Sequence, residues 1–435
     1  MRRARVPLLL IAVGLVLSDS AIVTLALPDI LRDLGSDVAG VAWVLIAFNL
    51  VLALAAVPAA RLCLHRDPAQ VCVAGIVVFA ASSAVCAVAP SMSVLIGARA
   101  VQAVGGALVI VSCLELLVVA AGAEKRGVTL WVSAGVVGLG TGPVLGGLLT
   151  SAFSWQSIFV VQVPLVLVAV TPALSLRQRD FVRHGPARDR PDVLANLALA
   201  LLSAALTAAI FLLVLLLVEG WRRSPATAAV AVTVVPAAAL LSSWLGHLLG
   251  APGRAEIVGG CVMLAGGLAA LAYLPAAKIP WTIAPQALIG LGLGLTVDSL
   301  TTNALRDRIP RALHGGWTIA ARHAGVVVGL AILTPVFTGD IRAAQPPAEE
   351  AIASVVLDAP LSARPRSLLL TAWGVSSTRR AVASRTCIRP SPRSTCAPMS
   401  WSPRPKSSAT SMIRSSVPPL ARSTTLSSSP PASPS

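Results

Sequence analysis

Long apolar blocks separated by short charged segments make up most of residues 1–340. A helix needs about 20 apolar residues to cross the hydrocarbon core of a bilayer. Backbone groups in lipid must pair within their own segment, so these blocks are predicted to be helices rather than alternating barrel strands. Eleven such blocks are predicted, at 7–27, 38–60, 69–89, 93–121, 128–152, 156–176, 193–218, 225–250, 257–277, 281–305 and 316–338.

The composition supports a membrane protein. The 435-residue chain is 56% hydrophobic and 12% charged, whereas soluble domains carry about 25% charged residues. The first block follows a basic start, Met1 to Arg5, but it is too long for the apolar core of a signal peptide. We therefore expect a retained first helix in an all-α membrane fold.

The distribution of Lys and Arg predicts the orientation. If the N-terminus lies in the cytoplasm, sixteen basic residues fall in cytoplasmic segments and five in external ones. Positive charge is enriched in cytoplasmic loops, so a cytoplasmic N-terminus and a multi-pass protein of a bacterial inner membrane are expected. The net charge of +16 does not indicate nucleic-acid binding, because the basic residues flank the apolar blocks or lie in the tail.

The loops also predict the domain organisation. A basic segment, 177–192, separates an N-terminal six-helix bundle, 1–176, from a C-terminal bundle of five visible helices, 193–338. Two six-helix halves joined by a basic cytoplasmic loop are typical of a two-bundle transporter, and a twelfth helix is missing from this pattern. An external segment is expected at 339–363.

The last residues, 364–435, are rich in Ser, Pro and Arg, with eleven basic residues and no acidic one. This composition predicts disorder. Two interpretations remain open. A shift of reading frame near residue 360 has replaced the original C-terminus, or the tail is natural.

Few ionisable residues lie inside the apolar blocks, and such residues are costly in hydrocarbon unless they serve a function. Asp19 lies midway along the first block and is a candidate for proton exchange; a static hydrogen-bonded carboxylate is the alternative. Arg99 and Gln102 lie one turn apart in the fourth block and share a helix face. Arg99 is expected to tune or bind Asp19, or else to hold two helices together.

The fifth block contains a run of small residues from Gly135 to Gly147. Small residues at spacings of three and four allow helices to approach closely. Pro143 removes one helical hydrogen bond and permits a bend. No strand precedes the run, so a nucleotide-binding loop is not indicated. We expect a bendable, tightly packed helix at a moving interface.

The second half offers Asp298, Asn303, Arg322 and His323 as polar candidates. Asp298 is placed toward the cytoplasmic end of its block, and Arg322 near the start of the last block. An Asp298–Arg322 gate pair is one hypothesis, and interfacial snorkelling of these side chains is the other. The seven cysteines form no C-x-x-C pair or His/Cys cluster, so packing is favoured over metal or redox chemistry.

These blocks together resemble the major facilitator superfamily, and most closely its drug:proton antiporter branch related to the QacA and EmrB exporters. The resemblance covers about residues 8–345. Gly138 to Gly147 matches the antiporter motif G-x-x-x-G-P-x-x-G-G in full, with Gly138, Gly142, Pro143, Gly146 and Gly147 at its fixed positions.

Other motifs match with substitutions. Asp19 to Pro28 is similar to D-x-T-I-V-N-V-A-L-P with Thr24 for Asn, and Trp43 to Phe48 is similar to W-V-x-x-A-Y with Phe for Tyr. Arg99 to Gly105 resembles R-x-x-Q-G-x-G with Ala103 for the first Gly. The motif after the second helix departs most, because Ala60 replaces its Gly and Leu64 its Asp. That Asp normally helps to lock the cytoplasmic contact between bundles, so the strength of this gate is in question.

The resemblance implies proton-driven export of a small apolar or cationic compound. The expected partners are that small molecule and the lipid bilayer, without nucleic acid. We expect a monomer that is not an enzyme, needs no cofactor or metal, and draws on the proton gradient. Two alternatives stay open: a facilitator or importer without proton coupling, and an inactive product of a damaged gene.

Overall fold

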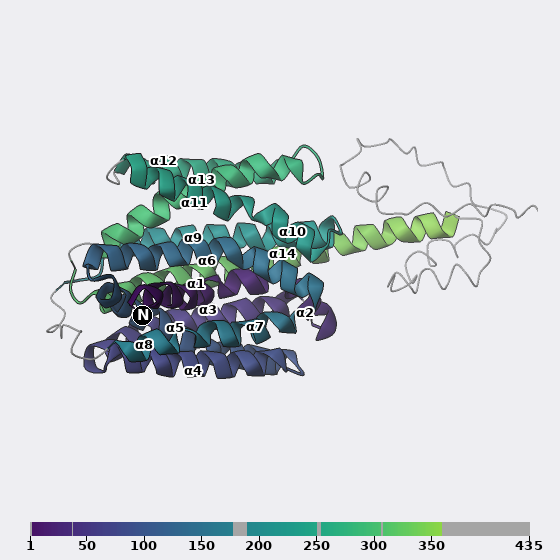
Figure 1. The fold of residues 1–435 in the computed structure, drawn as a ribbon. Coiled ribbons are helices and arrows are strands. Elements are labelled where there is room, and N and C mark those ends of the chain that lie inside the picture. Colours follow the sequence, from purple (N-terminus) through teal and green to yellow (C-terminus); the bar gives the residue numbers. More distant parts are fainter. Residues whose placement is uncertain (1, 37, 177–188, 250–253, 306–307, 359–435) are drawn as a thin grey trace, which may run out of the picture. The chain divides into compact units, whose positions relative to one another are not determined.

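The computed structural model describes residues 2–36, 38–176, 189–249, 254–305 and 308–358, and every regular element in these ranges is a helix (Figure 1). Residues 1–346 form one compact unit, and residue 347 begins a second. The packing discussed below belongs to the first unit. The predicted all-α membrane fold is confirmed.

The first half comprises eight helices. They are α1 (Arg2–Thr24), α2 (Leu27–Asp33), α3 (Val38–His65), α4 (Pro68–Ala87), α5 (Met92–Ala121), α6 (Glu124–Ala152), α7 (Gln156–Leu167) and α8 (Val170–Ser175). Capping explains several starts: Asp67 and Ser91 each accept a hydrogen bond from a backbone N–H in the first turn of α4 and α5. Pro28 lies in the first turn of α2, where its missing N–H costs nothing.

The second half contains α9 (Val193–Leu215), the short π-helix η2 (Leu216–Gly220), α10 (Pro225–Val232), α11 (Val234–Leu249), α12 (Arg254–Ala272), α13 (Pro280–Leu305) and α14 (Arg311–Asp358). Asp192 and Ser224 cap α9 and α10. Backbone N–H of Ala195 and, to a lesser extent, Arg308 hold the pKa of Asp192 below its usual range.

Ten helical segments among the described residues are long and apolar enough to cross a membrane. The sequence predicts eleven. The difference lies at 225–250, where the chain forms two shorter helices, α10 and α11, that meet at Thr233. The last segment also differs, since α14 continues as helix to Asp358 through most of the predicted external segment. The predicted tail, 364–435, and most of the predicted linker lie outside the described residues.

Each half is held together by its own helix pairs. In the first half, α5 packs against α3 and α4, α1 packs against α6, and α7 fills the space beside α4 and α1. In the second half, α11 and α12 both pack on α13. The halves meet where α10 and α11 lie against α6, and where Gly316 of α14 approaches the backbone of α3 at Ala56.

Glycines allow the backbones of α1 and α6 to touch. Gly138, Gly142 and Gly146 recur every four residues on one face of α6. A Cβ on Gly138 would collide with the carbonyl of Gly14, and one on Gly146 with the carbonyl of Ile22. The motif therefore holds these two helices in direct backbone contact.

We expect Gly146→Ala to lower the thermal unfolding midpoint of the detergent-purified protein, because the added methyl forces α6 away from α1. Gly97→Ala is the matched control: Gly97 also lies within a helix, but a Cβ there meets nothing within 4 Å. That control should be neutral or stabilising by about 0.5–1 kcal/mol, the usual gain over glycine in a helix. Equal midpoints for the two variants would show that the contact is not tight.

Candidate functional site

A buried ion pair lies at the centre of the first half. Asp19 of α1 and Arg99 of α5 are both 0% exposed, and Arg99 Nη1 donates to Asp19 Oδ2. The other carboxylate oxygen, Oδ1, accepts a hydrogen bond of 2.7 Å from Gln162 Nε2 of α7. An acid and a base that neutralise each other are far less costly in hydrocarbon than either alone.

Two glutamines extend the ion pair into a closed ring of four side chains. Gln102 Oε1 accepts from Arg99 Nη1 at 2.7 Å, and Gln102 Nε2 donates to Gln162 Oε1 at 2.8 Å. Gln102 Nε2 also donates to Ser83 Oγ of α4 at 2.7 Å. This polar ring, Asp19, Arg99, Gln102 and Gln162, connects α1, α5 and α7, and Ser83 adds α4. A network with most of its groups paired fixes one arrangement of these helices.

Aromatic rings complete the surroundings of Arg99. Its guanidinium carbon lies 4.0 Å from the centre of the Phe48 ring and 5.9 Å from that of Phe159. A cation above an aromatic face is attracted to the ring's electron density. Phe48, which replaces tyrosine in the family motif, therefore supports the charge of Arg99 without a hydroxyl group.

A second polar contact joins the two halves. His323 Nδ1 of α14 donates to Asn49 Oδ1 of α3 at 2.7 Å, and Asn49 Nδ2 donates to Ser20 Oγ of α1 at 3.0 Å. Ser20 follows Asp19 directly in the chain. The second half is thus connected by side-chain hydrogen bonds to the residue next to the buried carboxylate.

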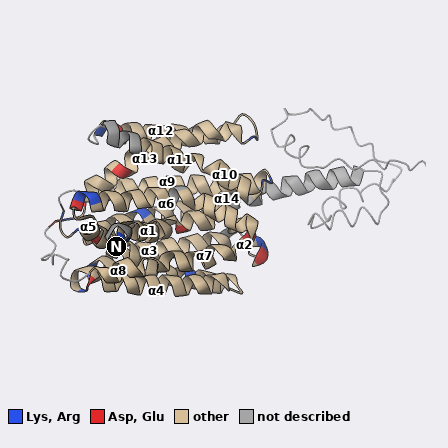
Figure 2. Ribbon diagram, in the orientation of Figure 1, with Lys and Arg blue, Asp and Glu red and all other residues tan. Residues whose placement is uncertain are grey.

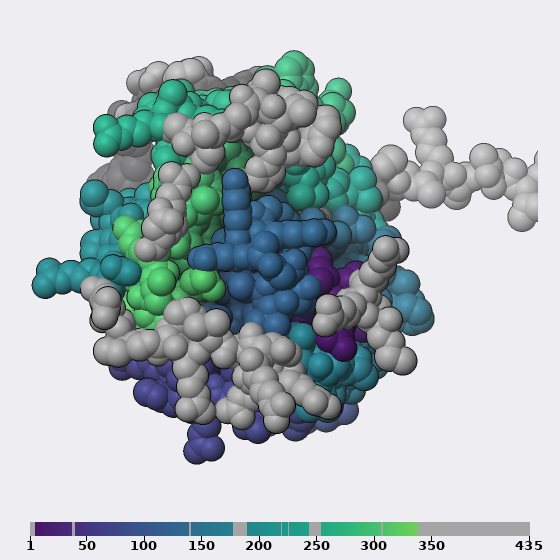
Figure 3. All heavy atoms as spheres, turned by 60° about the vertical axis from the view of Figure 1, so that its left-hand side comes forward, coloured from purple at the N-terminus to yellow at the C-terminus, as the bar shows by residue number. Residues whose placement is uncertain are grey.

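The halves also meet at the end where α1 begins, which we call the basic end because most described Lys and Arg lie there (Figure 2). Arg311 at the start of α14 forms an ion pair with Glu124 at the start of α6. The backbone N–H of Ala312 donates to Glu115 Oε1 of α5 at 3.1 Å. In Figure 3 the blue atoms of the α5–α6 region lie directly against the green start of α14.

We call the Arg311–Glu124 ion pair and the Ala312–Glu115 hydrogen bond the basic-end latch. The latch supplies the carboxylates that the poorly matched motif after the second helix lacks. Leu64 stands where the family pattern has an aspartate, so that position offers no carboxylate. Glu115 and Glu124 provide carboxylates from neighbouring helices instead. The two halves are therefore in contact at the basic end in this conformation.

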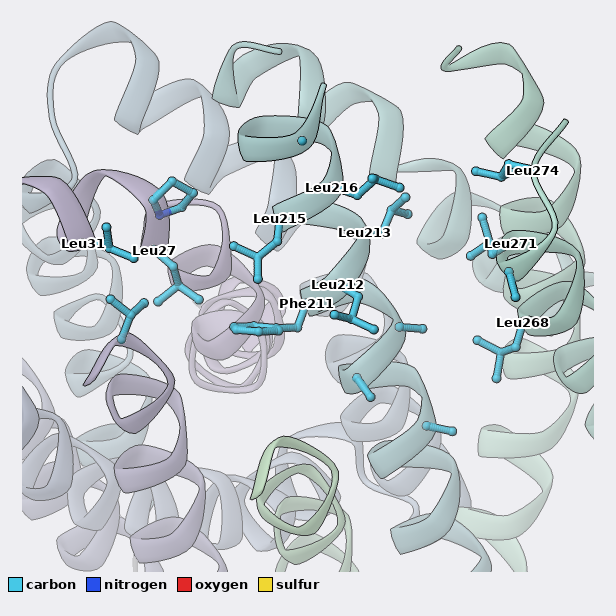
Figure 4. Close-up of a pocket in the computed structure, with 17 residues that line it drawn as sticks. Leu27, Leu31, Phe211, Leu212, Leu213, Leu215, Leu216, Leu268, Leu271 and Leu274 are labelled. Atoms are coloured by element: carbon cyan, nitrogen blue, oxygen red, sulfur yellow. The ribbon is translucent and has the colours of Figure 1, made fainter. Parts of the chain in front are cut away.

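Two cavities lie among helices of both halves. The larger, of about 750 Å³, is bordered by α2, α3, α9, η2 and α12. Figure 4 shows Phe211, Leu212 and their neighbours between Leu27 on one side and Leu268 on the other. Its lining side chains are all apolar, so it offers no group that would orient a ligand. It does not touch the polar ring.

The smaller cavity, of about 60 Å³, lies closer to the polar residues. It is bordered by α1, α6, α9, α10, α11, α13 and α14, and its lining includes Ala21, Pro143 and Arg322. Ala21 is two residues from Asp19, and Pro143 belongs to the glycine motif of α6. In this central cavity, helices of the two halves therefore face each other.

The structure brings together some predicted residues and separates others. Asp19, Arg99 and Gln102 lie within one network, and Gly138, Gly142 and Gly146 face α1, while Gly147 is buried on the same helix. Asp298 and Arg322 form no ion pair with each other among the described residues. The predicted gate pair is absent from this conformation.

The depth of Arg322 also differs from the prediction. The predicted block begins at 316, which places Arg322 near a membrane surface. The helix begins at Arg311, and the candidate span runs to Val336, so Arg322 lies near the middle of the span. The polar start of α14, with His314 and two glycines, hides the first turns of the helix from a search for apolar residues.

Sequence reasoning missed Gln162, Asn49, Ser83 and the basic-end latch. Gln162 and Asn49 are single amides within otherwise apolar stretches, and this signal was available. Glu115 lies toward the end of a predicted apolar block and Glu124 lies between two blocks, where charged side chains are ordinary. Their partners lie almost 200 positions away in the sequence, so no local pattern shows them.

Helical bundles in two halves, a buried charge network and a cavity between the halves are features typical of membrane transporters. The profile of the Major Facilitator Superfamily matches residues 9–337, and the chain belongs to this family. A bacterial homolog of the lysosomal transporter Spinster, in an inward-facing and unoccupied conformation, has the same fold. It aligns with a TM-score of 0.57 and 17% identity over 82% of this chain and 84% of that one.

Several curated relatives are efflux or resistance proteins. The multidrug resistance protein Stp of Mycobacterium tuberculosis is 36% identical over 36% of this chain and 31% of its own. The multidrug efflux pump LfrA of Mycolicibacterium smegmatis is 33% identical over 40% of this chain and 34% of its own length. The methylenomycin A resistance protein of Streptomyces coelicolor is 33% identical over 53% of this chain and 48% of its own length. The chain thus spans about a third to a half of the length of these relatives.

We expect Arg99→Gln to destabilise the protein by about 3–5 kcal/mol, because it leaves the Asp19 carboxylate buried without a cation. The double variant Asp19→Asn/Arg99→Gln should recover much of that loss, since no charge then remains in the ring. Titration of the purified protein with a denaturing detergent measures the apparent free energy of unfolding. If the loss of stability in the double variant equals the sum of the losses in Asp19→Asn and Arg99→Gln measured separately, the two residues do not interact.

We expect Glu124→Gln to open the basic end more often and to raise maleimide labelling of Cys63 by up to about fivefold, since an exposed ion pair contributes up to about 1 kcal/mol. Cys63 is 7% exposed on the face of α3 that includes Ala56 and Ala60, which approach α14. The labelling is measured in a chain whose other cysteines are replaced. Arg308→Gln is the matched control, because Arg308 pairs with Asp192 inside the second half. Equal labelling of both variants would contradict the latch.

Proposed function

We propose that this chain exports small, largely apolar compounds across the bacterial inner membrane in exchange for protons. The buried Asp19 carboxylate, held by Arg99 and Gln162 and close in sequence to the central cavity, carries the proposal. The efflux and resistance functions named for the relatives support the same class of activity. We further propose that the basic end faces the cytoplasm, in accordance with the distribution of Lys and Arg.

The proposed coupling depends on competition for Arg99. While Arg99 pairs with Asp19, the carboxylate is ionised and fully enclosed. A proton that reaches Asp19 neutralises it and removes the attraction that holds Arg99 in place. The ring then loses one of its bonds, and the packing of α1 against α5 becomes weaker. Protonation thereby shifts the population between two arrangements of the halves.

The connection to the cavity runs through α1 and α6. Ala21 and Pro143 both line the central cavity, and the glycines of α6 hold it against α1. A compound in the cavity therefore contacts the helix that carries Asp19. Opening the basic end also requires the latch, Glu115 and Glu124 with the start of α14, to separate.

A facilitator without proton coupling is the rival function within the same family, and the ion pair would then be purely structural. We expect Asp19→Asn in proteoliposomes to lose dye accumulation driven by an imposed pH gradient but to retain exchange of dye across the membrane. A panel of apolar dyes is followed by fluorescence, with an internal pH indicator reporting proton movement.

Glu256→Gln at the start of α12 removes a carboxylate far along the chain from the ring and serves as the control. It should accumulate dye as the unmodified protein does. Gradient-driven accumulation by Asp19→Asn at the unmodified rate would rule out the proton role. If no dye in the panel moves with the unmodified chain, the export proposal itself is wrong for this polypeptide.

A further inference from the structure

Arg322 lies near the middle of the apolar span of α14, and its partly exposed side chain lines the central cavity. It is the twelfth residue of α14, about 16 Å along the helix axis from Arg311 at 1.5 Å per residue. The candidate span runs from Arg311 to Val336, so a similar distance separates Arg322 from its other end. Snorkelling covers only side chains near helix ends. Its charge must therefore be balanced inside the protein.

The side chain of Arg322 lines the central cavity and has no protein counterion there. Among the described residues it forms no hydrogen bond and no ion pair. Of the fifteen residues that border the cavity, only Ser203 and Arg322 have polar side chains. The others include Leu206, Val235 and Pro143, which present carbon atoms.

Arg99 shows what a buried arginine in this protein ordinarily has. It pairs with a carboxylate, donates to a glutamine and lies above an aromatic ring. Arg322, in the second half, has the same charge without any of these contacts. The nearby acids do not substitute: Asp19 is engaged by Arg99 and Gln162, and Asp298 is not within ion-pair distance of Arg322.

We propose that Arg322 binds the carboxylate of an apolar organic acid. This acid is the substrate class of the export proposed above, and the inference rests on that proposal. A guanidinium offers two parallel N–H donors that match both oxygens of a carboxylate. The cavity volume of about 60 Å³ admits a few water molecules or one small functional group in this conformation. The carbon-rich walls fit the apolar body of the ligand once the halves separate.

This assignment differs from the cationic compounds that the resemblance implies. A cation in the central cavity would be repelled by Arg322, and no acidic residue is among the described residues that line this cavity. His323, the next residue, donates to Asn49 and so connects the same turn of α14 to the first half. Binding at Arg322 thus occurs beside a contact between the halves.

The test compares three ligands of similar shape: 1-naphthoate, its neutral amide 1-naphthamide, and 1-naphthylmethylammonium. The full chain is placed in nanodiscs of zwitterionic phosphatidylcholine, and binding is measured by isothermal titration calorimetry. We expect naphthoate to bind at least about tenfold more tightly than the amide, as a hydrogen-bonded charge pair allows. The ammonium ligand should bind most weakly. This comparison needs no variant.

The variants then assign the preference to one residue. Arg322→Gln should bring the affinities for naphthoate and naphthamide within about twofold, while Arg322→Lys, which keeps the charge but not the paired donors, should retain part of the difference. Arg254→Gln, at the exposed start of α12, is the control for loss of a positive charge and should keep the full preference.

Tighter binding of the ammonium ligand, no binding of any ligand, or an unchanged preference in Arg322→Gln would each overturn the inference. The assay measures equilibrium binding without a gradient, so it is separate from the transport test. A carboxylate preference that depends on Arg322, found in a chain that moves no dye, would retain the carboxylate-binding site and remove both the export proposal and the role of the acid as its substrate.

Discussion

The cost of an unbalanced charge in hydrocarbon governs this molecule. Water cannot solvate a side chain at the depth of Asp19 or Arg99, so each must find its counterion within the protein. The polar ring meets this requirement with groups from three helices, and it thereby fixes how α1, α5 and α7 lie against one another. The same requirement makes any change of charge at Asp19 a change in helix packing.

The two halves are joined by different kinds of contact at different depths. At the basic end an ion pair and a backbone hydrogen bond connect α14 to α5 and α6. Nearer the middle, His323 and Asn49 form one hydrogen bond, α10 and α11 pack against α6, and the small central cavity lies between the halves. Exposed charge pairs are weak and easily broken, whereas the buried contacts within each half are strong. This difference is what a protein requires if its halves are to rock as rigid bodies.

Much of the fold follows from the sequence because hydrocarbon imposes a simple rule on segment length and polarity. The block at 93–121 differs from α5 by one residue at its start, and 281–305 differs from α13 likewise. The rule fails where polar residues begin a helix, as at Arg311, or where a proline interrupts one, as Pro236 does just after Thr233. In both places the length and polarity of the apolar stretch do not show where the helix begins or ends.

The candidate site was only partly accessible to the same reasoning. The helical repeat places Arg99 and Gln102 on one face, and the scarcity of charge singles out Asp19. The repeat cannot say that Gln162 closes the ring, because the axial offset between α1 and α7 depends on packing far from either residue. Nor can it reveal that Arg322 lies in the cavity without a counterion. Pairing between helices is a property of the assembled bundle.

The glycine contact between α1 and α6 has a mechanical consequence. Backbones that touch leave no side chains between them to deform, so the two helices transmit displacement like a single stiff rod. In the export proposed above, a displacement of α6 at Pro143 would move α1, and with it Asp19, without any intervening side chains. A single methyl group added between α1 and α6 would separate the two backbones. A displacement of α6 by a ligand would then no longer be transmitted to Asp19.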